Sequence, residues 1–86
     1  MAYEWDEAKR ASNLANHGVD FADVSRFDFI GAVAEERSGE VRYVATGYIG
    51  NRLHKLVYLV RGGNIRVISL RKANNREREI YHERRG

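Results

Sequence analysis

Residues 65–81, which read IRVISLRKANNREREIY, join the clearest predicted strand of the chain to its clearest predicted helix. The strand covers Ile65 to Leu70, because β-branched and apolar residues suit a buried pleated surface. Asn74 can accept hydrogen bonds from free backbone N–H groups, and Glu77 follows three residues later, as in a capping box. We therefore predict a charged helix over residues 75–85, directly after the strand.

Charged and phenolic side chains gather in the sequence where this strand gives way to the helix. Arg71 and Lys72 lie at the end of the strand, just before the helix N-terminus. Glu77 and Tyr81 are four residues apart, which places them on one face of the helix. We predict that these groups meet at a place suited to hold a phosphate and to move a proton beside it.

Length and composition favour one small domain spanning residues 1–86. The chain has no cysteine, which excludes a disulfide or thiolate–zinc framework and suits a reducing cytoplasm. Its start, MAYEWDEAKR, carries acids where a signal peptide needs an apolar run. The longest apolar run is far shorter than the ~20 residues that span a bilayer. We expect a cytoplasmic protein that makes no use of a membrane.

The net charge of +3 is unevenly distributed along the chain. Residues 1–40 carry four basic and nine acidic residues (−5), whereas residues 41–86 carry eleven basic and three acidic residues (+8). A basic C-terminal half predicts a surface that binds a polyanion. The alternative is that Arg and Glu are simply good, solvated helix formers. That alternative explains less well the basic residues on or beside predicted strands, which are Arg42, Arg52, Lys55, Arg61 and Arg66.

The first third of the chain predicts two helices. Asp6 is suited to cap a helix from Glu7 to about His17, and Asp20 to cap a short one from Phe21 to Phe27. We predict that the two form an α-hairpin, joined at Gly18-Val19. The apolar stripe expected to pack the first helix against a sheet consists of Ala8, Ala11, Leu14 and Ala15.

Short apolar segments separated by turns predict a sheet in the rest of the chain. The strands are expected at residues 32–35, 41–49, 52–61 and 65–70, with turns at 37–40, 50–51 and 62–64. A further short edge strand is expected at Tyr3-Glu4-Trp5. Loops this short force successive strands to be antiparallel. The expected fold class is α+β: an N-terminal α-hairpin, a three- to four-stranded antiparallel sheet and a C-terminal helix.

Three segments resemble the BrnT family, the toxin halves of type II toxin–antitoxin pairs: EWDEAKRASNLANHGVDF, VRYVATGYIGNRLHKLVYLVRGG and IRVISLRKANNREREIY. The most specific patterns are WDxxKxxxNxxxHG near the start and ISxRxAxxxExxxY near the end. They are carried by Trp5, Asp6, Lys9, Asn13, His17, Gly18, Ile68, Ser69, Arg71, Ala73, Glu77 and Tyr81. Asn74-Asn75 departs from the family, whose members often have more basic residues there.

The resemblance implies a RelE-like fold and a metal-independent ribonuclease that inhibits translation. It also implies neutralisation by a small DNA-binding antitoxin, and hence a hetero-oligomer with that partner. From the residues alone, a non-catalytic module that binds nucleic acid or a partner through the same basic surface remains an alternative. A third possibility is that the basic residues mainly bind an acidic segment of the antitoxin. One face can serve both RNA and antitoxin, since a partner that covers the site also neutralises it.

Metal-free RNA cleavage by the 2′-OH needs a base, cations for the extra phosphate charge, and an acid for the leaving 5′-oxygen. Arg61 and Arg71 are the leading candidates for the cations, because an arginine fork pairs with two phosphate oxygens. Both end predicted strands, and position parity places them on the same-sense face of their own strands. If those strands are neighbours, we expect both arginines to converge on one phosphate. The alternatives are a solvated Arg61 beside a glycine turn, and an Arg71 that forms a salt bridge to Glu77.

The remaining candidate catalytic residues each have a structural alternative. Glu77 can act as a base, orient an arginine or cap the helix, and Tyr81 can donate a proton, stack on a base or anchor the helix. His54 can act as general acid or base, or be merely structural. Asn13 and His17 are expected to form a hydrogen-bonded pair near a helix end. Further RNA contacts are expected from Lys9, Arg52, Lys55, Lys72 and Arg76.

No zinc or magnesium ligand pattern and no glycine-rich phosphate loop occur in the sequence. We therefore expect no metal site and no cofactor.

Overall fold

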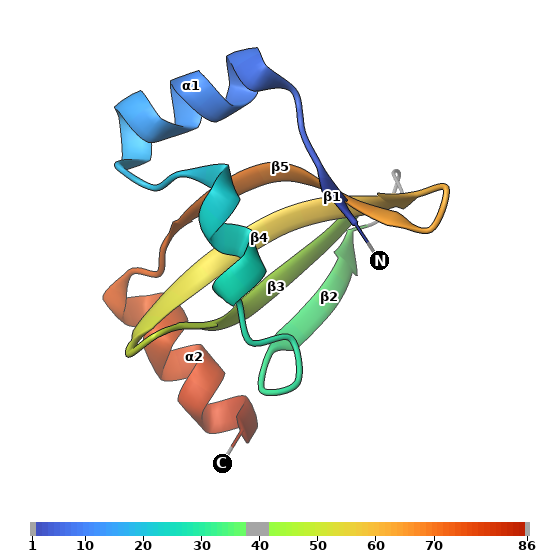
Figure 1. Ribbon diagram of the computed structural model, residues 1–86. Coiled ribbons are helices and arrows are strands. Elements are labelled where there is room, and N and C mark those ends of the chain that lie inside the picture. The colour runs from blue at the N-terminus through green and yellow to red at the C-terminus, as the bar shows by residue number, and fades with distance from the viewer. Residues whose placement is uncertain (1, 38–41, 86) are drawn as a thin grey trace.

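The computed structural model describes residues 2–37 and 42–85. Its centre is a five-stranded sheet with helices packed on it (Figure 1). In chain order the elements are β1 (Tyr3–Glu4), α1 (Glu7–His17), the 3₁₀ helix η1 (Phe21–Arg26), β2 (Val33–Arg37), β3 (Arg42–Ile49), β4 (Arg52–Arg61), β5 (Asn64–Lys72) and α2 (Asn75–Arg85). The strands lie in the order β1-β5-β4-β3-β2. The α+β class expected from the sequence is confirmed.

The sheet is mixed, which corrects the expected three- to four-stranded antiparallel sheet. Strands β2 to β5 do form an antiparallel series, each paired with the next. The fifth strand, β1, pairs in parallel with β5, with Tyr3 opposite Ile65. Loop length decides the direction of consecutive strands only. The partner of β1 lies about sixty residues further along the chain, so no local pattern reveals it.

Two hairpin turns in the described part of the sheet depend on glycines with positive φ. Gly50 has φ 62° in the β3–β4 turn, and Gly62 and Gly63 have φ 57° and 80° in the β4–β5 turn. This left-handed region suits glycine, which has no Cβ to clash. Both turns were expected from the sequence. Residues 38–40 of the turn expected at 37–40 lie outside the described residues, and Arg37 is the last residue of β2.

Helix α1 has the predicted bounds but not the predicted packing. Asp6 Oδ1 accepts from the Ala8 N–H at 2.8 Å, and Gly18 ends the helix with φ 70°. The apolar stripe of Ala8, Ala11, Leu14 and Ala15 is nevertheless exposed. The buried residue of α1 is Asn13. Hydrogen bonds from the Asn13 side chain to a strand backbone take the place of apolar burial.

Asn13 ties α1 to β5 through its side-chain amide. Its Nδ2 donates to the carbonyl oxygens of Val19 at 2.9 Å and Leu70 at 2.7 Å, and its Oδ1 accepts from the Leu70 N–H at 3.3 Å. The expected partner, His17, is not involved, so the predicted Asn13–His17 pair is wrong. The amide meets the backbone of the neighbouring strand instead.

The second helical segment is a 3₁₀ helix, so the expected α-hairpin is not confirmed. Asp20 caps η1 as predicted, accepting from the Ala22 N–H at 2.9 Å. The same carboxylate also receives two bonds from Arg10, both of 2.8 Å, which join α1 to η1. The segment is six residues long, and short helical pieces commonly take the tighter 3₁₀ form.

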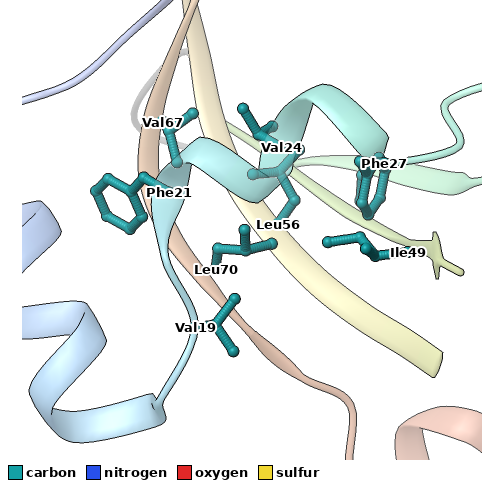
Figure 2. Packing of buried hydrophobic residues seen from close by; sticks show 9 residues of the cluster. Val19, Phe21, Val24, Phe27, Ile49, Leu56, Val67 and Leu70 are labelled. Carbon is teal, nitrogen blue, oxygen red and sulfur yellow. The ribbon is translucent and has the colours of Figure 1, made fainter.

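Two apolar clusters lie on opposite faces of the sheet. The larger, shown in Figure 2, contains Val19, Phe21, Val24, Phe27, Ala45, Ile49, Leu56, Val67 and Leu70. Here the segment around η1 covers one face. A smaller cluster of Leu53, Ala73 and Tyr81 holds α2 on the other face. Strand side chains alternate between faces, so Leu53 and Leu56 of β4 serve different clusters.

Across the described part of the chain, no helix is long and apolar enough to cross a membrane.

Candidate active site

A cationic pair lies where β4, β5 and the first turn of α2 meet. Lys55 of β4 and Arg71 of β5 are directly opposed cross-strand partners. Like charges in this position repel each other. Glu77 of α2 lies between them: its carboxylate accepts from Arg71 Nη1 and Nη2, both at 2.8 Å, and lies 3.8 Å from Lys55 Nζ. One carboxylate therefore holds two cations from two strands in fixed positions.

The same carboxylate also begins the helix. Glu77 Oε1 accepts from the Asn74 N–H at 2.9 Å, and the Glu77 N–H donates to Asn74 Oδ1 at 2.8 Å. This is the capping box expected from the sequence. The predicted salt bridge between Arg71 and Glu77 is confirmed as well. The start of α2 and the arrangement of Lys55, Arg71 and Glu77, called here the clamp, thus depend on one side chain.

The environment of Glu77 keeps it ionised. The hydrogen bonds from Arg71 contribute most, and the Asn74 N–H and the positive charge of Lys55 contribute too. Together they outweigh burial and lower the pKa of Glu77 from 4.5 to about 2. The same pairing raises the pKa of Arg71. A carboxylate with so low a pKa is a poor proton acceptor near neutral pH. Its geometry is that of a positioning residue.

A hollow of about 160 Å³ opens beside this clamp. Its lining comes from β2, β3, β4 and α2, and consists of Val33, Glu35, Thr46, Lys55, Glu77, Ile80, Tyr81 and Arg84. Two members of the clamp, Lys55 and Glu77, line the hollow, and 22% of the Lys55 side chain is exposed. Across the hollow, Arg84 forms an ion pair with Glu35. The Lys55 ammonium can therefore meet an anionic group that enters from solvent.

Arg61 does not lie near this clamp. It pairs with Asn64 at the β4–β5 turn, whereas Arg71 pairs with Lys55. Arg61 lies six positions beyond Lys55 along β4, which corresponds to roughly 20 Å at ~3.3 Å per residue. The expectation that Arg61 and Arg71 converge on one phosphate is wrong. The C-terminal ends of neighbouring antiparallel strands point in opposite directions, so two arginines that end such strands are kept apart.

His54 belongs to the other face of the sheet. It precedes Lys55 on β4, so the two side chains point in opposite directions. His54 is 6% exposed, and its Nδ1 lies 2.9 Å from the Arg52 carbonyl oxygen. Burial lowers the pKa of the imidazole, and the nearby charges of Lys72 and Arg52 lower it further. His54 is thus a buried residue, separated from the Lys55–Arg71 pair by the sheet.

Tyr81 anchors α2 to the body of the protein. It is 7% exposed and packs in the smaller cluster, with its ring edge-on to Tyr48 at 5.8 Å. Its hydroxyl donates to the Gly31 carbonyl oxygen at 2.7 Å. The phenol does line the hollow beside the clamp. Its proton, however, is already engaged with the backbone.

The other expected RNA contacts are dispersed over the surface. Lys9 is exposed on α1, in a polar hollow of about 180 Å³ that it shares with His17. Lys72 is exposed at the end of β5, opposite His54, and Arg76 is exposed on the first turn of α2. Arg52, at the start of β4, lines a separate hollow on the other side of α2.

The sequence reasoning missed the neighbours of Arg52 in that hollow. They include Arg78 and His82, which are four residues apart on α2. Each directly follows a residue that was singled out, Glu77 or Tyr81. Their spacing is the signal that could have revealed them, because residues four apart share a helix face.

Within residues 2–37 and 42–85, no three His, Cys, Asp or Glu side chains gather in an arrangement that could hold a metal ion.

The α+β fold and the clamped cations at the junction of sheet and last helix define a small protein suited to act on a polyanion. A family model described as "Ribonuclease toxin, BrnT, of type II toxin-antitoxin system" matches residues 5–77. The chain therefore belongs to the BrnT family, and it is an endoribonuclease toxin with RNA as substrate and an antitoxin as partner. The resemblance seen in the sequence is confirmed.

A solved structure agrees with this assignment. The crystal structure of the Brucella abortus ribonuclease toxin, BrnT, matches with a TM-score of 0.75 and 31% sequence identity. The match covers 87% of this chain and 100% of that chain. No curated protein matches the chain.

Proposed function

We propose that this toxin cleaves RNA without a metal ion, at the clamp formed by Lys55, Arg71 and Glu77. The observation that carries the proposal is the single Glu77 carboxylate that holds two cations, from neighbouring strands, beside an open hollow. Positive charge fixed in this way stabilises a phosphate that gains negative charge, with little reorganisation during the reaction.

In the proposed reaction, the ribose 2′-oxygen forms a bond to the adjacent phosphorus while the bond from phosphorus to the 5′-oxygen breaks. The 2′-OH proton passes to water, and the leaving 5′-oxygen takes a proton from the Lys55 ammonium, which solvent then restores. The products are a 2′,3′-cyclic phosphate and a 5′-hydroxyl. Arg71 supplies fixed positive charge, and Glu77 positions both cations.

The test is RNA cleavage in the presence of EDTA, with end-group analysis of the products. Lys55→Ala and Arg71→Ala are each expected to lower kcat by roughly 10²–10³, as for one lost donor at a developing charge. Arg85→Ala, which removes an exposed arginine at the far end of α2, is the matched control. Loss of all cleavage with EDTA, restored by a divalent cation, would contradict the proposal. Binding without cleavage by the wild type would favour the non-catalytic module.

We propose further that the domain is RelE-like, acts in the cytoplasm and inhibits translation until a DNA-binding antitoxin covers the clamp in a hetero-oligomer. The antiparallel series β2–β5 followed by α2, and membership of a type II toxin family, support this proposal. Expression of the chain alone should slow growth, and Arg71→Ala should relieve the effect. Normal growth during strong wild-type expression would count against it. Co-purification with the product of the neighbouring reading frame tests the partner.

A further inference from the structure

A second cationic hollow lies on the other side of α2, between this helix and the β3–β4 hairpin. Figure 1 shows the turn of this hairpin beside α2. This hollow, called here the hairpin pocket, has a volume of about 320 Å³ and is lined by Tyr48, Asn51, Arg52, Leu53, Arg78 and His82. The hairpin contributes the first four residues and α2 the last two. Leu53 is 2% exposed and forms a fixed apolar floor. The basic residues that line the hollow with Leu53 are Arg52, Arg78 and His82.

The charge of the hairpin pocket is not balanced from within. No carboxylate lines it, and neither Arg52 nor Arg78 forms an ion pair in the described residues. Arg78 donates only to the neutral Asn75 side chain, at 3.2 Å. Five other arginines of the described chain are paired with acids: Arg10 with Asp20, Arg26 with Asp23, Arg66 with Glu4, Arg71 with Glu77 and Arg84 with Glu35. Among the described residues Arg61, Arg76 and Arg85 form no ion pair either, but they do not line the hairpin pocket. Arg52 and Arg78 both line one hollow without a carboxylate partner, which favours an anionic ligand, and a guanidinium group pairs well with phosphate oxygens.

The rings in the hairpin pocket suit the rest of a nucleotide. Tyr48 and His82 both pack edge-on against Tyr81, with ring centroids 5.8 and 5.4 Å away. These contacts fix the two rings in place. Aromatic and apolar surface beside phosphate-binding groups is typical of sites that hold an unstacked base. The volume of about 320 Å³ lies at the lower end of the range for small-ligand sites.

The hairpin pocket and the clamp share one helix. Arg78 and His82 directly follow Glu77 and Tyr81, so the two pairs form adjacent stripes of α2, about 100° apart around the axis. A strand of RNA that crosses the first turns of α2 can therefore reach both places. We propose that the hairpin pocket binds a nucleotide flanking the cleaved link, with its phosphate between Arg52 and Arg78. This inference rests on the RNA-cleaving role proposed for the clamp.

The first measurement is binding of an uncleavable, fully 2′-O-methylated RNA of about 12 nucleotides, by fluorescence anisotropy across a salt series. Arg52→Ala and Arg78→Ala should each lower the slope of log Kd against log salt by ~0.7, the value for one lost phosphate contact on a single strand. The double variant should lose about twice as much. Arg85→Ala is the control for loss of one exposed arginine, and thermal unfolding checks that each variant is folded.

The second measurement is steady-state cleavage of the unmodified RNA. Both variants should raise KM severalfold and leave kcat nearly unchanged, because the lost contact is made equally before and during the reaction. Unchanged slopes together with an unchanged KM would overturn the inference. So would competition by inorganic phosphate as strong as that by the RNA, which would indicate a site for free phosphate.

Two further outcomes distinguish this inference from binding of an acidic protein segment and from the reaction proposed at the clamp. A poly-glutamate peptide that loses affinity for both variants, while the RNA slopes stay unchanged, would overturn the inference in favour of an acidic protein segment. A wild type that binds the methylated RNA but cleaves none of the unmodified RNA would refute the clamp reaction alone. The slopes would still decide whether Arg52 and Arg78 contact RNA.

Discussion

Replacing Glu77 with Gln tests the clamp most directly. The change keeps the shape of the side chain but removes the charge that lies between Lys55 and Arg71. In the variant these two cations oppose each other across neighbouring strands with no carboxylate between them. An amide also cannot accept both bonds from the Arg71 fork, because one of its two polar atoms is a donor. We expect a less stable protein and a less ordered Arg71.

The size of the effect follows from the lowered pKa of Glu77. Lowering this pKa from 4.5 to about 2 corresponds to about 3 kcal/mol of favourable interaction with the ionised form. The Arg71 side chain is 36% exposed, so solvent screening reduces the expected loss to about 2 kcal/mol. In a domain of this size that loss lowers Tm by roughly 8–16 °C.

The assay is urea unfolding of wild type and Glu77→Gln from pH 7 down to pH 3. The folded-state pKa of Glu77 lies below its unfolded value, so its contribution is complete above about pH 4.5 and is lost as pH falls towards 2. The difference in unfolding free energy should therefore shrink as the solution is acidified. Glu79→Gln, at an exposed glutamate of the same helix, is the control. An equal difference at pH 7 and pH 3, or none at pH 7, would refute the reasoning.

Three other changes probe the fold and the site. Asn13→Ala leaves the Leu70 backbone without its buried partners, and it should cost about 2–4 kcal/mol in urea unfolding; a loss under 1 kcal/mol would show that α1 is held in some other way. Tyr81→Phe removes the bond to the Gly31 carbonyl and should cost about 1 kcal/mol. Abolished cleavage by this variant, where it is still folded, would instead support Tyr81 as the proton donor. Arg61→Ala should change kcat for RNA by less than about threefold, because Arg61 lies far from the clamp; a hundredfold loss would show that substrate reaches both ends of the sheet.

The sequence by itself determined the features that depend on nearby residues. The capping box of Asn74 and Glu77, the start of α2 and both glycine turns follow from a few consecutive positions. The pairing of Arg71 with Glu77 was also foreseeable, because only the first turn of the helix separates them. Family membership could be recognised too, because its patterns are short and specific.

Only the tertiary structure decided which distant residues meet. It separated Arg61 from Arg71, because the C-terminal ends of adjacent antiparallel strands point in opposite directions. It set Lys55 against Arg71, and it brought Arg52 to the same hollow as Arg78. Periodicity assigns a side chain to one face of its own element, but not to a neighbour. Which elements become neighbours depends on how the whole chain assembles its sheet and buries its core. Contacts between residues far apart in the sequence determine that arrangement.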